Sequence, residues 1–260
     1  MKKLTRQEIY ELIRKFSNNP LGVLDACGGL YICPKDESGK RLGPLVGYAG
    51  TYTEGKQYVG DIYANFAKAE EYVDIINYWA LAMSSDEEKD LLLSSASVFI
   101  GLPEGGKSFA MALSSQPGHS GRYIYLEKVV TAVKTETERE KSKLVFNRHD
   151  IIPGDKIVLV EDLQNNFSTT GKAIDQVISV GGEVIALASI MNRSPFVDTV
   201  FTWNNKEYPV LTLLRRPYPE YEQTDSYVAE DVQKGNVIWK PKNDWVVVEK
   251  IIENYPNKID

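Results

Sequence analysis

Several features that mark particular protein classes are scarce or missing in this sequence. It has two cysteines in 260 residues, Cys27 and Cys33. These are too few for a disulfide scaffold and lack the spacing of a zinc site, so we expect reduced packing residues. The net charge of −6 argues against a general nucleic-acid-binding protein. No apolar run could span a bilayer, and no signal-peptide core follows the first residues, so we expect a cytoplasmic protein.

What is present suits a soluble globular fold. The chain is 43% hydrophobic and 25% charged, and its length allows one domain or at most two. It has no internal repeat and no low-complexity tract.

The most informative stretch is residues 156–193. An apolar run at 157–160 predicts a strand buried on both faces, and it ends on two carboxylates, Glu161 and Asp162. A helical pattern follows, and residues 184–190 predict a second buried strand. The order strand, helix, strand indicates a βαβ unit with acid at a strand tip.

The helix of this unit begins with hydroxyls and a glycine. Unpaired N–H groups and the dipole make a helix N-terminus an anion site. The two acids would repel a phosphate there, so they would face sugar hydroxyls or a divalent cation, and a phosphorylated sugar satisfies both requirements. The alternative is that the acids only solubilise a strand end and the threonines act as N-caps. The residues at the helix start are Ser168, Thr169, Thr170 and Gly171, followed by Lys172.

The segment VLVEDLQNNFSTTGKA resembles the binding motif for phosphoribosyl pyrophosphate (PRPP) of the type I phosphoribosyltransferases. More narrowly, the chain resembles the orotate phosphoribosyltransferase family, whose further blocks occur in the same order. They cover most of the chain between about residues 50 and 220. The blocks are TEGKQY (53–58), FIGLPEGGKSFAMAL (99–113), YLEK (125–128), KLVFNRHDIIPGDKIVLVED (143–162) and GGEVIALASIMNRS (181–194).

The resemblance implies a pyrophosphate-binding loop between a strand at 97–102 and a helix that continues to residue 113. A glycine turn between strand and helix presents backbone N–H groups to an anion, although it also occurs as a plain turn. Glu104 departs from the family, because a carboxylate beside pyrophosphate is repulsive unless it faces Mg²⁺ or solvent. The loop residues are Pro103, Glu104, Gly105, Gly106 and Lys107.

Residues 129–143 are strongly charged and carry no apolar stripe, which predicts a mobile loop or a solvated hairpin. The resemblance implies that such a loop closes over the active site of the neighbouring subunit. It also places Lys128 near the phosphates and Asp162 among the catalytic residues. A charged surface loop is the alternative for any single residue. The candidates in the loop are Lys134, Arg139, Lys141 and Lys143.

The resemblance assigns two residues to the base. Lys56 would lie in a hood over it, the alternative being an exposed loop lysine. Arg193 would meet the planar carboxylate of orotate through two parallel N–H bonds, the alternative being a structural ion pair with a neighbouring acid. Asn192 stands where the family usually has aspartate. Residues 163–168 lengthen the loop between the acids and the helix, which could still close on the 5′-phosphate.

We expect an α/β fold, a mostly parallel sheet flanked by helices, with the ligand crevice at the carboxyl ends of the strands. Residues 1–68 would form a helix, a hairpin of 23–27 with 30–33, and the hood. Residues 69–225 would form the phosphoribosyltransferase core, and residues 226–260 an extension packed on that core.

The resemblance implies Mg²⁺-dependent transfer of 5-phosphoribosyl from PRPP to a nucleobase, with orotate preferred, in a homodimer. Mg²⁺ would be held mainly by PRPP, with Glu161 and Asp162 as further candidate ligands. Two alternatives stay open: a protein that senses PRPP or a nucleotide without turnover, and a salvage enzyme for another base.

Overall fold

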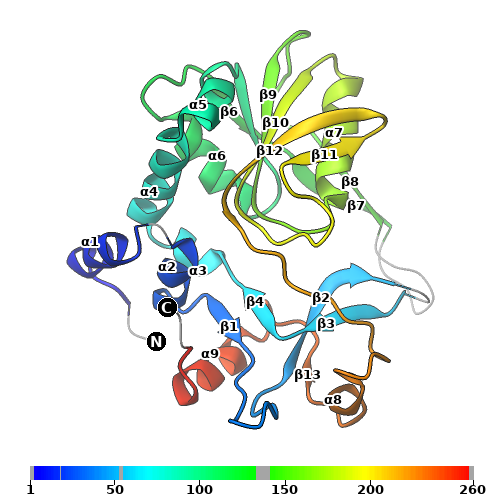
Figure 1. The fold of residues 1–260 in the computed structure, drawn as a ribbon. Coiled ribbons are helices and arrows are strands. Elements are labelled where there is room, and N and C mark those ends of the chain that lie inside the picture. Colours follow the sequence, from blue (N-terminus) through cyan, green and yellow to red (C-terminus); the bar gives the residue numbers. More distant parts are fainter. Residues whose placement is uncertain (1–2, 18, 53–54, 133–140, 258–260) are drawn as a thin grey trace. The chain divides into compact units, whose positions relative to one another are not determined.

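The computed structural model describes residues 3–17, 19–52, 55–132 and 141–257 (Figure 1). The chain forms two compact units, one of residues 1–72 with 218–260 and the other of residues 73–217. No helix within the described residues is long and apolar enough to cross a membrane.

The second unit is built on a six-stranded sheet, which confirms the predicted α/β class. All neighbouring strands are parallel except the edge strand β11, which runs antiparallel to β12. In sheet order the strands are β11 (Val200–Trp203), β12 (Lys206–Arg215), β10 (Glu183–Asn192), β9 (Lys156–Gln164), β5 (Val98–Gly101) and β6 (Arg122–Tyr125).

Helices and a hairpin complete this unit. In α7 the predicted stripe faces the sheet through Ile174 and Val177, whereas Ile178 is exposed. The charged segment forms a hairpin of β7 (Glu127–Ala132) and β8 (Lys141–Val145), one of the two predicted forms. The helices are α4 (Val73–Ser84), α5 (Glu87–Ser94), α6 (Gly106–Ser114) and α7 (Ser168–Ser179).

The prediction that the first strand ends at the acids is wrong. Strand β9 continues to Gln164, because its pairing with β10 extends to Gln164 opposite Asn192. Glu161 and Asp162 therefore lie inside a paired strand, so their side chains alternate between its two faces.

The first unit holds two small sheets. An antiparallel pair joins β1 (Leu30–Ile32) and β4 (Ile62–Ala64), and a second sheet has the order β13-β2-β3. A capping box of Thr5 and Glu8 begins α1. The other elements are α1 (Arg6–Lys15), α2 (Pro20–Ala26), β2 (Leu45–Thr51), β3 (Gln57–Gly60), α3 (Ala67–Glu70), α8 (Ala229–Gln233), β13 (Val237–Ile238) and α9 (Trp245–Asn254).

The predicted hairpin of residues 23–27 and 30–33 is wrong, because its first arm is helical. Asn19 accepts a hydrogen bond from the N–H of Gly22, and Pro20 is the first residue of α2. An N-cap followed by proline starts a helix, so Asn19-Pro20 both follows one helix and begins the next.

Residues 226–260 belong to the first unit. Trp245, Val248 and Ile252 of α9 pack in one cluster with Tyr31 and Tyr48 of the first unit. The apolar stripe of α9 completes a core that the short strands there cannot close alone. The unit boundaries fall after residues 72 and 217.

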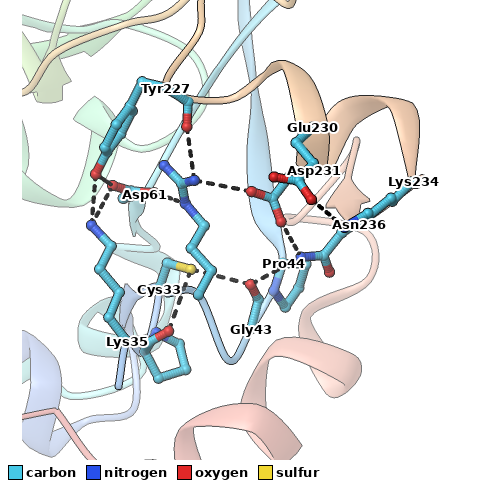
Figure 2. Close-up of polar contacts among 12 residues, drawn as sticks. Cys33, Lys35, Gly43, Pro44, Asp61, Tyr227, Glu230, Asp231, Lys234 and Asn236 are labelled. Atoms are coloured by element: carbon cyan, nitrogen blue, oxygen red, sulfur yellow. Dashed lines mark hydrogen bonds and ion pairs between the residues drawn. The ribbon is translucent and has the colours of Figure 1, made fainter. Parts of the chain in front are cut away.

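Within the first unit, a charged network joins residues 35–61 to residues 227–231 (Figure 2). Arg41 donates from Nε to Asp61 (2.8 Å) and from one terminal nitrogen to Asp231 (3.0 Å), and its side chain is 9% exposed. Its guanidinium lies 4.3 Å from the ring centre of Tyr227. Tyr227 and Lys35 each donate to Asp61, at 2.6 and 2.9 Å.

The cysteines behave as predicted packing residues. Both are free thiols, and Cys33 donates to the carbonyl of Gly43 at 3.2 Å (Figure 2). Burial raises the pKa of Cys27 to about 12 and that of Cys33 to about 11, so neither is a reactive thiolate at neutral pH.

Candidate functional site

The predicted sugar-phosphate motifs meet at the carboxyl ends of β5 and β9. These strands are parallel neighbours, with Gly101 paired to Val160. The chain leaves β5 through the loop 102–105 and enters α6, and it leaves β9 through 165–167 and enters α7. Two loops and two helix N-termini therefore occupy one edge of the sheet, which is the usual ligand position in such folds.

Two glycines let the first loop pack directly on β9. A Cβ on Gly105 would lie 2.1 Å from a carboxylate oxygen of Asp162. A Cβ on Gly106 would lie 2.0 Å from the carbonyl oxygen of Val160. At Gly106 the close atoms are backbone, so only glycine fits there, whereas a side chain at position 105 would displace the Asp162 carboxylate. The predicted pyrophosphate loop and the predicted ribose acid are thus in direct contact.

Glu104 does not face the site alone. It forms an ion pair with Lys107 at 2.8 Å, and its side chain is 68% exposed. Lys107 also lies 5.1 Å from the ring centre of Tyr125 at the end of β6. The repulsion expected between Glu104 and a pyrophosphate is therefore reduced by a neighbouring cation and by solvent.

The two carboxylates point to opposite faces of the sheet. Ile157 and Leu159 face α7, and Glu161 continues that row, accepting a hydrogen bond from the Thr170 hydroxyl at 3.1 Å. Asp162 lies on the other face against Gly105. Side chains two residues apart share a face of a strand, so the extension of β9 fixes this split.

Glu161 is a perturbed acid. The residue is half-buried, and desolvation raises its pKa to about 8, helped by the charge of Asp162 and opposed by the Thr170 hydrogen bond. A strongly shifted carboxyl at the edge of a parallel sheet is typical of a ligand site.

The long loop before α7 has a structural task. Phe167 adopts φ 56°, is 2% exposed and stacks on Phe201 at 4.7 Å between ring centres. Asn166 accepts a hydrogen bond from the N–H of Ser168 at 3.1 Å. These residues of the lengthened loop thus anchor and cap the first turn of the helix.

Gly171 serves packing. A Cβ on Gly171 would lie 2.9 Å from the ring of Trp203, and Nε1 of that ring donates to Asp175. The N–H of Gly171 donates to the carbonyl of Phe167. The close packing against Trp203 is therefore sufficient to explain why residue 171 is glycine. Within the described structure no group accepts from the N–H groups of Thr169 and Thr170, which leaves both for a ligand.

The lysine candidates are spread over the unit. Lys143 and Lys172 line a hollow of about 380 Å³ along the flank of α7, with Asp175 and Gln176 among its other walls. Lys172 follows Thr170 by two residues, so it projects from another side of the helix. Lys128 is exposed on β7.

Three loop candidates fall wholly or partly outside the described residues. Arg139 and Lys134 lie outside the described residues, and of Lys141 only the backbone at the start of β8 is described. Lys56 is exposed in the first unit, between β2 and β3.

At the end of β10, the hydrogen bonds of Asn192 explain why this position is not an aspartate. Its amide donates to the carbonyls of Val197 (3.0 Å) and Asp198 (3.1 Å), and its Oδ1 accepts from the N–H of Ser194. An aspartate has no proton to give to two carbonyls. Arg193, the predicted orotate contact, is only 4% exposed.

The sequence did not single out Gln164 and Ser189. Ser189 donates to Gln164 at 2.9 Å, both are fully or almost fully buried, and Ser189 lies opposite Glu161 in the pairing of β10 with β9. The polar run 161–166 reads as loop, so only the strand pairing with β10 places Gln164 in the core.

The donor set fits a Mg²⁺ held mainly by a ligand. Among the described residues no group of three or more His, Cys, Asp or Glu side chains could hold a metal ion. Glu161 and Asp162 face apart, so one carboxylate at most would join phosphate oxygens around one ion. That is a common arrangement for Mg²⁺.

Comparison with known proteins agrees with these motifs. No family model matches the chain. Orotate phosphoribosyltransferases from Carboxydothermus hydrogenoformans and Desulforamulus reducens are 35% identical over 78 residues and 36% over 59 residues, covering 28% and 22% of this chain. The chain spans only 41% and 31% of their lengths.

Among solved structures, orotate phosphoribosyltransferase from Aeropyrum pernix aligns with a TM-score of 0.46 and 14% identity, over 82% of this chain and 97% of that one. Over these matched stretches, the sequence of the chain is similar to that of orotate phosphoribosyltransferases.

Proposed function

We propose that the second unit binds PRPP and transfers its 5-phosphoribosyl group to a nucleobase, with orotate preferred. The observation that carries this proposal is the packing of the Gly105–Gly106 loop on Asp162, one residue from the acid that accepts from the first turn of α7. A pyrophosphate subsite, a ribose subsite and a 5′-phosphate subsite would then share one edge of the sheet.

Each group has a distinct task in this proposal. The loop 103–107 and Lys128 bind pyrophosphate, and the α7 N-terminus binds the 5′-phosphate. Asp162 and Glu161 hold ribose hydroxyls. Displacement at the anomeric carbon passes through a cationic sugar, so catalysis would come from positioning and charge stabilisation. The remaining assignments are Arg139, Lys141 and Lys143 for the leaving group, and Lys56 and Arg193 for the base.

Mg²⁺ and a second subunit complete the proposal. The chemistry that a bound Mg²⁺ supplies is neutralisation of pyrophosphate charge. Asp162 would contact it, because its carboxylate lies against Gly105 of the loop. The homodimer follows from the loop assignment, in which the charged segment 129–143 serves the neighbouring subunit.

The test is pyrophosphate release from PRPP and Mg²⁺ with orotate, uracil, adenine or hypoxanthine. Orotate should give the fastest release. Asp162→Asn should weaken PRPP binding about tenfold or more, since it removes charge-assisted hydrogen bonds. Asp150→Asn, at an exposed acid of the same unit, is the matched control and should bind PRPP normally. A faster reaction with a purine would refute the orotate preference and leave the phosphoribosyl site standing.

The second candidate is a PRPP- or nucleotide-sensing protein without turnover. The observation that favours it is the burial of Arg193, which is 4% exposed and so poorly accessible to a base. PRPP binding by calorimetry, with no pyrophosphate release for any base, would support the sensor over the enzyme.

A further inference from the structure

The Thr170 side chain is turned toward an acid. Thr170 is the third residue of α7, is 1% exposed, and donates from its hydroxyl to one carboxylate oxygen of Glu161 at 3.1 Å. A threonine hydroxyl has a single proton to donate, so this hydroxyl cannot also donate to a phosphate while the bond persists. Its neighbours differ, since Ser168 is exposed and Thr169 is half-buried.

Glu161 depends on this contact for its orientation. Among the residues that the structure describes, Thr170 is the single hydrogen-bond donor to the Glu161 carboxylate. The bond reaches one oxygen and leaves the other for a ligand. A threonine in a helix has few side-chain rotamers, so the donor itself is held firmly.

We propose that Thr170 is a positioning residue, whose hydroxyl aims the Glu161 carboxylate at a ring hydroxyl of a bound sugar phosphate. The 5′-phosphate is then met by Ser168, by Thr169 and by the free N–H groups of the first turn. This inference rests on the proposed function and narrows it. It divides one sequence motif into a part that binds phosphate and a part that serves sugar recognition.

The two roles predict different responses to the ligand. A residue that binds phosphate affects every ligand carrying that phosphate. A residue that orients Glu161 affects only ligands with ring hydroxyls. Ribose 5-phosphate and tetrahydrofurfuryl phosphate form a suitable pair, because the second keeps the ring and the phosphate and lacks the ring hydroxyls.

Calorimetry with both ligands tests the proposal. The wild type should prefer ribose 5-phosphate by about tenfold or more. Thr170→Val should reduce that preference at least about threefold while tetrahydrofurfuryl phosphate binds as before, and Thr170→Ser should restore it. Thr170→Ala removes the hydroxyl without adding a methyl group, and it replaces the valine variant if that one does not fold. Thr169→Val should weaken both ligands alike.

A double-mutant cycle isolates the pair. In the Glu161→Gln background, Thr170→Val should have little further effect on ribose 5-phosphate binding, because the two side chains act as one unit. Equal weakening of both ligands by Thr170→Val, failure of serine to rescue, or additive losses in the cycle would overturn the proposal. Equal binding of both ligands by the wild type would overturn this inference alone. Binding of neither would refute the sugar-phosphate function itself.

Discussion

Asp61 in the first unit and Glu161 in the second are both half-buried carboxylates, and their pKa values move in opposite directions. Burial alone would raise both. At Asp61, hydrogen bonds from Arg41, Tyr227 and Lys35 outweigh burial and lower the pKa below its ordinary 3.8. At Glu161, one threonine hydroxyl opposes burial and the charge of Asp162, and the pKa rises to about 8.

The opposite pKa shifts indicate different roles for the two acids. Asp61 has its charge matched by three donors from two segments of the chain, residues 35–41 and Tyr227, so both carboxylate oxygens already have partners within the fold (Figure 2). Glu161 has one such donor, so its raised pKa of about 8 keeps it protonated near neutral pH, and its charged form costs stability unless a ligand brings donors. Unsatisfied acids of this kind concentrate at functional sites.

The largest expected effect is a loss of stability when a partner of Asp61 is removed. Arg41→Leu leaves Asp61 and Asp231 without their shared cation, and it should cost about 3 kcal/mol of unfolding free energy, as when one partner of a buried pair is removed. Urea unfolding, with hydrogen exchange of β2 and β3 amides as the reporter, measures it. Lys234→Gln is the control, because its pair with Glu230 is exposed and should contribute nothing measurable. A loss below about 1 kcal/mol would show that the network is not structural.

The next effect concerns how stability changes with pH through the two acids. The folded pKa of Glu161 is about 8 against an ordinary 4.5, so between these values the folded protein binds a proton that the unfolded chain lacks. Stability therefore falls as pH rises across this window and levels off above it. Asp61 acts the other way, contributing fully above pH 3.8 and losing its contribution as pH falls through its lower folded pKa.

Glu161→Gln should remove the neutral-range slope, so that the variant gains stability relative to wild type from pH 5 to pH 9. Melting temperatures across this range provide the measurement. Glu183→Gln, at an exposed glutamate that begins β10, is the matched control and should keep the wild-type slope. Parallel curves for wild type and Glu161→Gln would contradict the raised pKa.

The smallest expected effect is the loss of stability when one hydrogen bond to Asp61 is removed. Tyr227→Phe removes the 2.6 Å hydrogen bond to Asp61 and keeps the ring against Arg41. It should cost about 1 kcal/mol, since the arginine and lysine remain. Tyr10→Phe, on an exposed ring of α1 in the same unit, controls for loss of a hydroxyl and should be neutral. If both variants have the same unfolding free energy, the hydrogen bond from Tyr227 to Asp61 does not contribute to stability.

Local patterns in the sequence were sufficient for much of the second unit. The apolar runs predict β9 and β10, the helical stripe predicts α7, and the glycine turn before residue 107 predicts the loop that packs on Asp162. These features depend on residues close together in the chain, where periodicity and turn chemistry act directly. The capping box that begins α1 was predictable for the same reason.

Features that depend on distant partners were missed. Whether Asn19-Pro20 ends one helix or starts the next depends on where the following apolar residues find a core. The C-terminal stripe of Trp245 and Val248 can pack on any apolar surface, and only the tertiary structure selects the first unit.

Local sequence patterns are enough to predict two acids, a glycine loop and a helix rich in hydroxyls at one edge of a parallel sheet. That Glu161 and Asp162 face apart depends on the fold, because pairing with β10 extends β9 past both of them. The fold also decides that Asp61 is charge-matched while Glu161 is not, because the partners of Asp61 come from residues up to 166 positions away. A carboxylate's pKa is set by the donors that folding brings to it, and spacing along the chain does not encode those donors.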